Sequence, residues 1–181
     1  MAERLLAVAY APTAETRIPM FGGWSGPALG DVSVLDGRVA SWVRGPEPVA
    51  AQTAEMLGGG AEAEVLSELA DADFGAWAEL TLDEVGEREP QALRVWLLDP
   101  WVSPHGGESL ADLIWRVGQA IDQHPWPEGR SVAVVAPLVA RALAVHALGA
   151  PPEVIFRVDV APLGRVLMSR SGDHWRLQGL S

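Results

Sequence analysis

The sequence predicts an α/β protein of three layers, in which helices cover both faces of a mostly parallel central sheet. Short apolar strand patterns alternate with helical patterns along the chain, which is typical of parallel strands joined by crossover helices. The segment 130–136 is almost continuously apolar, as expected for a central strand buried on both faces. With 181 residues, the chain is long enough for one domain, 1–181, with a continuous core.

The strands are predicted from short apolar runs that end in turn residues. The first run leads directly into the turn 11–13, and the last two strands are separated by Ser171-Gly172-Asp173, which predicts an antiparallel edge. Residues 17–34 are rich in glycine and proline and are predicted to form a long loop. The expected strands are 5–10, 64–66, 130–136, 154–160, 165–169 and 174–180.

The helices are predicted from apolar spacing and from their end signals. Leu110, Leu113, Ile114, Val117 and Ile121 recur at helical spacing, so one face of that helix is expected to pack inward. In the mixed loop and helical stretch 71–99, a threonine at 81 followed by a glutamate at 84 predicts a capping box. The expected helices are 47–56, 109–123 and 138–148, the first ending at a triple glycine and the last at Gly149.

The composition excludes several classes of partner. A formal charge of −11 argues against nucleic-acid or membrane partners, because polyanions bind cationic faces. There is no lysine, so Schiff-base chemistry and a P-loop lysine are excluded, and there is no cysteine, so disulfides and thiolate metal sites are excluded. The start, Met1-Ala2-Glu3-Arg4, carries no signal-peptide pattern, and no apolar run is long enough for a membrane span. Cytoplasm is the expected location.

Five segments in order resemble the histidine phosphatase superfamily, the phosphoglycerate-mutase-like fold. The strand before Ala11-Pro12-Thr13-Ala14-Glu15 resembles the family's opening strand and its Arg-His-Gly-x-Thr signature. The other matches are Ala50-Ala51-Gln52-Thr53-Ala54-Glu55, the stretch Leu69 to Trp77 with Asp-Phe-Gly-x-Trp, Pro104-His105-Gly106-Gly107-Glu108-Ser109-Leu110 with Arg116 after it, and 132–143 with Arg141-Ala142-Leu143. The resemblance covers most of the chain and implies the family's fold, with residues about 76–128 as its helical cap region.

The resemblance also implies that the phosphate-transfer site has been lost. The family uses a histidine nucleophile, a second histidine, two arginines and an acid, because a transferring phosphoryl group carries negative charge. At those positions this sequence has Tyr10 for the nucleophile, Pro137 for the second histidine, Ala9 and Val49 for the arginines, and Asp71 for the acid. A pocket that keeps Asp71 and Glu108 without arginine would repel phosphate. We therefore expect neither a phosphatase nor a mutase.

The residues at these positions predict a neutral-to-acidic, apolar pocket for a small uncharged molecule. Tyr10 and Asp71 are the candidate acid and base of a repurposed enzyme, such as an isomerase, cyclase, lyase or hydrolase, and Glu108 is a weaker candidate. No cofactor is expected, and no pair of histidines has metal-ligand spacing. The candidate substrate contacts are Ala9, Thr13, Trp24, Val49, Pro137 and Leu138.

Several alternatives stay open at this point. The chain could be an inactive scaffold that binds a ligand or a protein, including a homodimer partner, or a weak phosphatase of the family. Tyr10 could simply fill the histidine's volume and bond to Asp71, and Glu108 could act only on the dipole of the helix that it precedes. The four histidines, including His105, are expected at the surface or in helix packing. Arg141 is expected to anchor its helix to nearby carboxylates.

Overall fold

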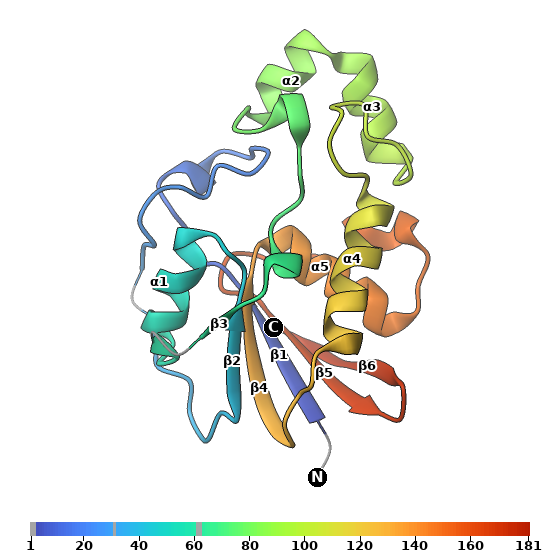
Figure 1. Ribbon diagram of the computed structural model, residues 1–181. Coiled ribbons are helices and arrows are strands. Elements are labelled where there is room, and N and C mark those ends of the chain that lie inside the picture. The colour runs from blue at the N-terminus through green and yellow to red at the C-terminus, as the bar shows by residue number, and fades with distance from the viewer. Residues whose placement is uncertain (1–2, 31, 61–62) are drawn as a thin grey trace.

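A computed structural model describes residues 3–30, 32–60 and 63–181, and Met1 and Ala2 of the predicted leading segment lie outside these ranges. Its centre is one six-stranded sheet with the order β3-β2-β4-β1-β5-β6 (Figure 1). β1 pairs with β4, β4 with β2 and β2 with β3 in parallel, whereas β5 and β6 form the predicted antiparallel edge. The strands are β1 (Glu3–Ala9), β2 (Ser41–Arg44), β3 (Glu64–Val65), β4 (Gly129–Val135), β5 (Arg165–Ser171) and β6 (His174–Leu180).

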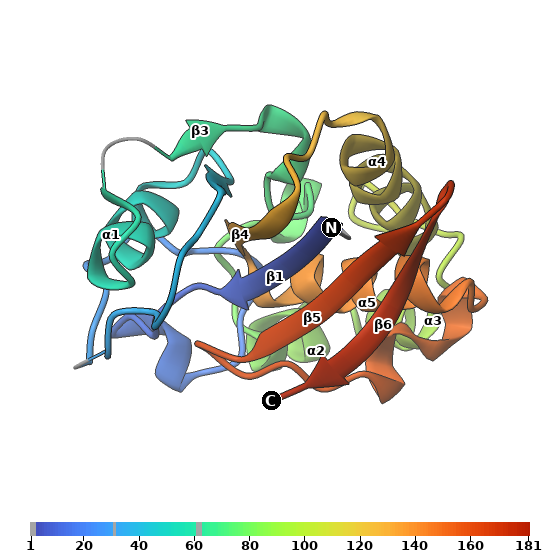
Figure 2. The ribbon, with the colours of Figure 1, turned by 90° about the horizontal axis from the view of Figure 1, so that it is seen from below.

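Helices cover both faces of this sheet, which confirms the predicted three layers. α1 (Pro48–Met56) lies against β2 and β4, whereas α5 (Pro137–Leu148) lies against β1, β5 and β6 and packs on α4 (Leu110–Gln123) (Figure 2). Short 3₁₀ turns complete the chain: η1 (Glu15–Arg17), η3 (Ser67–Leu69), η4 (Gly75–Trp77) and η5 (Pro152–Arg157). No helix in the described part of the chain is long and apolar enough to cross a membrane.

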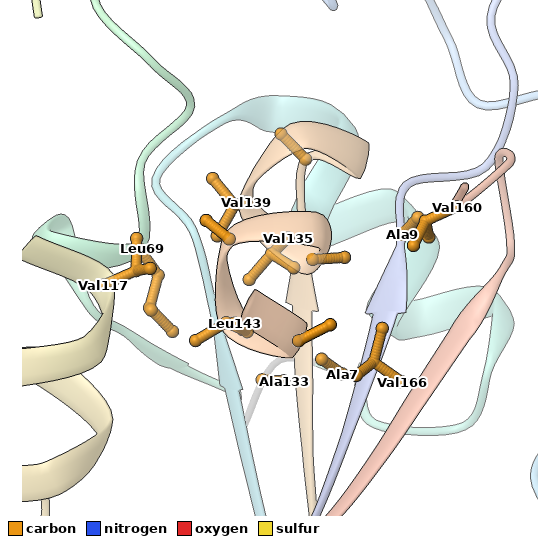
Figure 3. Close-up of a cluster of buried hydrophobic side chains, with 14 of the residues drawn as sticks. Ala7, Ala9, Leu69, Val117, Ala133, Val135, Val139, Leu143, Val160 and Val166 are labelled. Carbon is orange, nitrogen blue, oxygen red and sulfur yellow. The ribbon is translucent and has the colours of Figure 1, made fainter. Parts of the chain in front are cut away.

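The core lies between α5 and the two central strands. Figure 3 shows Ala7 and Ala9 of β1 beside Ala133 and Val135 of β4, on the face that Val139 and Leu143 of α5 cover. Successive residues of a strand point to opposite faces, so the intervening valines and leucines of β1 and β4 are buried on the other side. Small alanines on the α5 face let that helix approach the sheet closely.

Two helices stand apart from the layers. α2 (Leu82–Arg88) and α3 (Pro90–Leu98) pack on each other and project beyond the C-terminal ends of the parallel strands (Figure 1). α2 begins with the predicted capping box, in which Thr81 and Glu84 bond each other's backbone N–H groups. Only this helical pair projects, because α4, which falls within the predicted cap region 76–128, packs on α5 as part of a layer.

The prediction differs from the structure in two elements. The segment 154–160 is not a strand, because the 3₁₀ turn η5 begins at Pro152 and covers most of it; two prolines in sequence favour a helical start over a sheet ladder. β2 was not predicted, because its four residues, Ser41–Arg44, contain one fully buried side chain and carry little strand signal. The other predicted helices and strands are confirmed to within a few residues.

Candidate functional site

The candidate site lies where β1, β2 and β4 end. Tyr10 directly follows β1, and its backbone N–H donates to the Val135 carbonyl at the end of β4. The Tyr10 side chain is 0 % exposed, and its hydroxyl donates to the Glu47 carboxylate. Burial, and then the negative charge of Glu47, raise the pKa of the phenol above its ordinary value. The hydroxyl is therefore a neutral, partnered donor inside the protein.

Glu47 is the residue that sequence reasoning missed. It lies between two prolines immediately before α1, so the segment after β2 turns its carboxylate inward toward Tyr10. Its second oxygen, Oε1, accepts the backbone N–H of Asp71 at 2.7 Å. Glu47 thus bridges Tyr10 and Asp71, and no hydrogen bond joins those two side chains directly among the described contacts. The only feature of the sequence that could have indicated a role for Glu47 is that it is a charged residue within an otherwise apolar segment.

Asp71 accepts two hydrogen bonds of its own. Its Oδ1 accepts the backbone N–H of Ala72 at 2.8 Å, and its Oδ2 accepts the Trp24 indole N–H at 3.1 Å. Burial, assisted by the Glu47 charge, raises the pKa of the Asp71 carboxyl to about 7 although both hydrogen bonds oppose the shift. Asp71 is therefore present in both protonation states near neutral pH, as an acid–base group requires.

Trp24 joins the loop 19–24 to this cluster. Its ring stands edge-on to the Tyr10 ring, with centroids 5.8 Å apart and planes at 81°. The same loop forms backbone hydrogen bonds with the segment before α2, from Phe21 to Leu80 and from Leu82 to Pro19. The first part of the loop 17–34, which was predicted from glycine and proline content, is therefore held in place as a wall of the site.

Glu108 does not reach Tyr10 or Asp71 through any described contact. Both of its oxygens accept from Arg116 at 2.8 Å, a bidentate ion pair. Arg116 also donates to the backbone carbonyls of Glu68 and Ala70, at 2.7 and 3.1 Å. Glu108 therefore acts on the segment that carries Asp71 by orienting Arg116.

An apolar pocket of about 350 Å³ opens beside Asp71. Of the residues proposed from sequence, Trp24, Asp71, Pro137 and Leu138 line it, and Arg141 lines it while pairing with Asp159 at 2.8 Å, the anchoring role predicted for it. This apolar pocket is lined by Pro19, Met20, Phe21, Gly22, Trp24, Asp71, Phe74, Leu82, Trp96, Leu97, Pro137, Leu138, Arg141 and Phe156.

Besides Glu108, four of the proposed site residues do not line this pocket. Tyr10, Ala9, Thr13 and Val49 are buried in the protein interior, so the space predicted between them is filled. Ala9 packs in the core beside Val160 (Figure 3). The prediction placed the pocket among these residues, but Tyr10 is buried with its hydroxyl donating to Glu47, and the apolar pocket opens beside Trp24 and Asp71.

A second hollow, also about 350 Å³, shares Phe21, Trp24, Asp71 and Phe74 with the apolar pocket and is lined on its other side by Glu47, Asp73 and Glu79. Within the described residues, no group of three or more acidic or histidine side chains is arranged to hold a metal ion. The surroundings of Asp71 are therefore apolar on one side and acidic on the other.

His105 is a correction to the expected surface position. It is buried among the rings of Trp77, Phe74 and Trp96, and burial lowers the pKa of its imidazole. Its Nδ1 accepts the backbone N–H of Gly107 at 3.1 Å, which fixes the loop before α4. His105 is part of the aromatic core under the α2–α3 pair.

Comparison with known proteins decides the family. Residues 39–181 match the family model of the histidine phosphatase superfamily (branch 1). The chain belongs to this superfamily. The matched region begins after β1, so Tyr10 lies outside it, whereas Glu47, Asp71 and Pro137 lie inside it.

The chain is also similar in sequence to curated proteins of mycobacteria. The chain is 30 % identical to the bifunctional protein Rv2228c of Mycobacterium tuberculosis (strain ATCC 25618 / H37Rv) and to the uncharacterized protein Mb2253c of Mycobacterium bovis (strain ATCC BAA-935 / AF2122/97). In both cases 88 % of the chain aligns with 49 % of the relative, so the chain spans about half the length of these relatives.

Solved structures share the superfamily fold over nearly the whole chain. Mycobacterial glucosyl-3-phosphoglycerate phosphatase Rv2419c is similar with a TM-score of 0.80 at 22 % identity, covering 98 % of each chain. The alpha-ribazole phosphatase of Shigella flexneri is similar with a TM-score of 0.78 at 16 % identity, covering 98 % of this chain and 95 % of that one. At such identities the likeness establishes the fold alone.

Proposed function

We propose that this chain is a non-phosphatase member of the superfamily whose apolar pocket binds a small uncharged molecule, with Asp71 as the group that contacts its polar end. The observation that carries the proposal is the hydrogen bond from the Tyr10 hydroxyl to Glu47 at the end of β1. The resemblance assigns that position to a phosphate-accepting histidine. Here it holds a buried phenol and a carboxylate, which together offer phosphate neither a nucleophile nor a cation.

Electrostatics supports the exclusion of phosphate. A phosphate in the hollows beside Asp71 would face the carboxyl groups of Asp71 and Glu47. At an effective dielectric constant of ~20, a phosphate charge ~5 Å from one ionised carboxylate is repelled by about 3 kcal/mol. Among the residues lining the apolar pocket, the only basic one is Arg141, which Asp159 partly neutralises. A phosphate dianion would meet more repulsion than attraction, whereas a neutral molecule would lose little on entering.

The pocket lining supports an apolar ligand with one hydrogen-bonding end. Five aromatic rings contribute to the wall, and such surfaces bind flat or apolar groups. Asp71 supplies an acceptor when ionised and a donor when protonated. The family relatives named as phosphatases share the fold, and we assign this chain a different ligand because its own residues differ at the phosphate position.

A second candidate is a repurposed enzyme in which Asp71 transfers a proton. The observation that favours it is the pKa of about 7 for Asp71, which suits a general acid or base at neutral pH. The Tyr10 hydroxyl is buried and already donates to Glu47, so in this candidate Tyr10 supports the site and Asp71 alone meets substrate.

The test uses a matched pair of probes, phenol and phenyl phosphate, which share a ring and differ in charge. We expect ligand-detected NMR to show phenol bound in the apolar pocket, phenyl phosphate bound at least tenfold more weakly, and no hydrolysis of phenyl phosphate. Leu138→Gln should weaken phenol binding, because it places a polar group in the apolar wall. Hydrolysis that is lost in Asp71→Asn or Tyr10→Phe would restore the phosphatase alternative and overturn the proposal.

A further inference from the structure

The α2–α3 pair carries a second apolar hollow that the proposed function does not use. It measures about 420 Å³ and is lined by Gly86 of α2 and by Pro90, Leu93, Arg94, Leu97 and Leu98 of α3. Leu97 also lines the apolar pocket beside Asp71. We call this hollow on α2 and α3 the trough, which is distinct from the acidic hollow beside Asp71. Its shared leucine makes the two spaces neighbours along one surface.

Helical spacing shows how the trough continues the pocket. On α2, Leu82 lines the pocket and Gly86, four residues later, lines the trough. On α3, Leu97 lines both, and Leu93, four residues earlier, lines the trough. Residues four apart lie on one face of a helix, about 6 Å apart along its axis. Matching faces of both helices therefore run from the pocket toward the tip of the pair.

The trough is apolar and open. Leu97 is 45 % exposed and Leu98 is 71 % exposed, although both are large aliphatic side chains. Gly86 has no side chain, and a Cβ placed there would meet only the Leu93 Cδ2 atom, at 3.6 Å. The glycine thus leaves room between the helices. Arg94 is the only charged residue of the trough, and its aliphatic stem can cover a hydrocarbon chain while its guanidinium stays in water.

We propose that the ligand is an amphiphile, whose uncharged polar head lies beside Asp71 and whose hydrocarbon tail lies in the trough between α2 and α3. This inference rests on the proposed function, because the head group uses the same pocket. The pocket alone accounts for a compact molecule, whereas the pocket and trough together suit a molecule with a polar end and an extended apolar chain. Asp71 provides the polar contact at the inner end, and Leu97 is the point at which the tail passes from pocket to trough.

The test is a chain-length series of 4-alkylphenols, from phenol itself to 4-octylphenol, titrated below their aggregation concentrations by isothermal calorimetry. Each added methylene that becomes buried should tighten binding about fourfold. For the unmodified protein we expect this gain to continue into the longer tails. In Gly86→Leu, whose new side chain fills the trough, the gain should stop at short tails while the affinity for phenol is unchanged.

Glu87→Leu is the matched control, because it adds the same side chain to the next, exposed position of α2, outside the trough. It should follow the unmodified protein through the whole series. A gain that stops at short tails in the unmodified protein, or continues unchanged in Gly86→Leu, would overturn the amphiphile while phenol binding still supported the proposed function. Failure of phenol itself to bind would overturn the proposed function and the amphiphile with it.

Discussion

The end of β1 and the α2–α3 pair differ in how many of their side chains have partners within the protein. At the end of β1, the Tyr10 hydroxyl donates to Glu47, which also accepts the Asp71 backbone N–H; Tyr10 is fully buried and Glu47 is half-buried. In the α2–α3 pair, large aliphatic side chains such as Leu98 remain in contact with water. The first region resembles the core in its internal hydrogen bonds, whereas the second exposes apolar side chains that a ligand can cover.

This difference indicates which part of this member of the superfamily is open to a ligand. The hydrogen-bonded cluster adds stability and fixes neighbouring loops, and its buried phenol, Tyr10, does not line the apolar pocket. The open pocket and trough have the unsatisfied apolar area that a ligand can cover. Asp71 belongs to both regions, since its backbone is held by Glu47 and its side chain lines the pocket.

The largest effect should come from breaking the closed cluster. Glu47→Ala leaves the Tyr10 hydroxyl without its acceptor inside the protein and removes the acceptor of the Asp71 N–H. We expect a loss of about 2–4 kcal/mol in the free energy of unfolding, measured by urea denaturation. Glu55→Ala, on an exposed position of α1, is the control and should change stability by less than about 0.5 kcal/mol. Equal effects would show that Glu47 is not a structural bridge.

A smaller loss is expected when the donor is removed and the acceptor kept. Tyr10→Phe retains the ring and its packing against Trp24 but deletes the hydroxyl that donates to Glu47. Glu47 keeps the Asp71 N–H and can recruit water, so we expect a loss of about 1–2 kcal/mol in the same denaturation experiment. A stability unchanged or raised in this variant would contradict a structural role for the phenol.

The pH dependence of stability should isolate Asp71. Its pKa rises from 3.8 in the unfolded chain to about 7 in the folded protein, so the folded state retains a proton that the unfolded state has released between these values. Raising the pH through this window therefore disfavours folding through this group. The melting temperature of Asp71→Asn should therefore rise relative to that of the unmodified protein as the pH increases to about 7. Above that pH, the difference between the two melting temperatures should be constant. A constant difference throughout would contradict the shift.

The smallest effect is expected in the open region. Gly86→Ala replaces a glycine inside α2 at a position where a Cβ meets only an ordinary contact. Alanine favours the helix over glycine by about 0.5–1 kcal/mol, so thermal unfolding should show a modest stabilisation with phenol binding unchanged. A destabilisation would mean that α2 and α3 pack more tightly here than the trough allows.

The sequence predicted most of the fold because the strongest elements have strong local signals. β4 is a continuous apolar run and α4 has regular apolar spacing with Ser109 as its N-cap, so each could be recognised alone. β2 and η5 could not, since β2 is held by pairing with β4 across 90 residues and η5 begins at prolines within a strand-like pattern. Such long-range pairing leaves no trace in four residues.

The sequence predicted individual residues of the site but not the hydrogen bond from Tyr10 to Glu47 that connects them. The sequence indicated Tyr10, Trp24 and Asp71, but the Tyr10–Glu47 contact joins residues 37 positions apart, and nothing local predicts it. Without Glu47, the vacated phosphate position was expected to be open, and Ala9 and Val49 were expected to line it. Tyr10, Ala9 and Val49 are instead fully buried, and the apolar pocket is lined by Trp24 and Asp71.

The most direct test of this account is the dissociation constant of phenol for the unmodified protein and for Tyr10→Phe, measured by NMR titration. If the phenol of Tyr10 is a closed structural group and the ligand meets Asp71 in the outer pocket, the two constants should agree within about twofold. A tenfold or greater loss of affinity in a variant that remains folded would place Tyr10 in contact with the ligand and contradict the account.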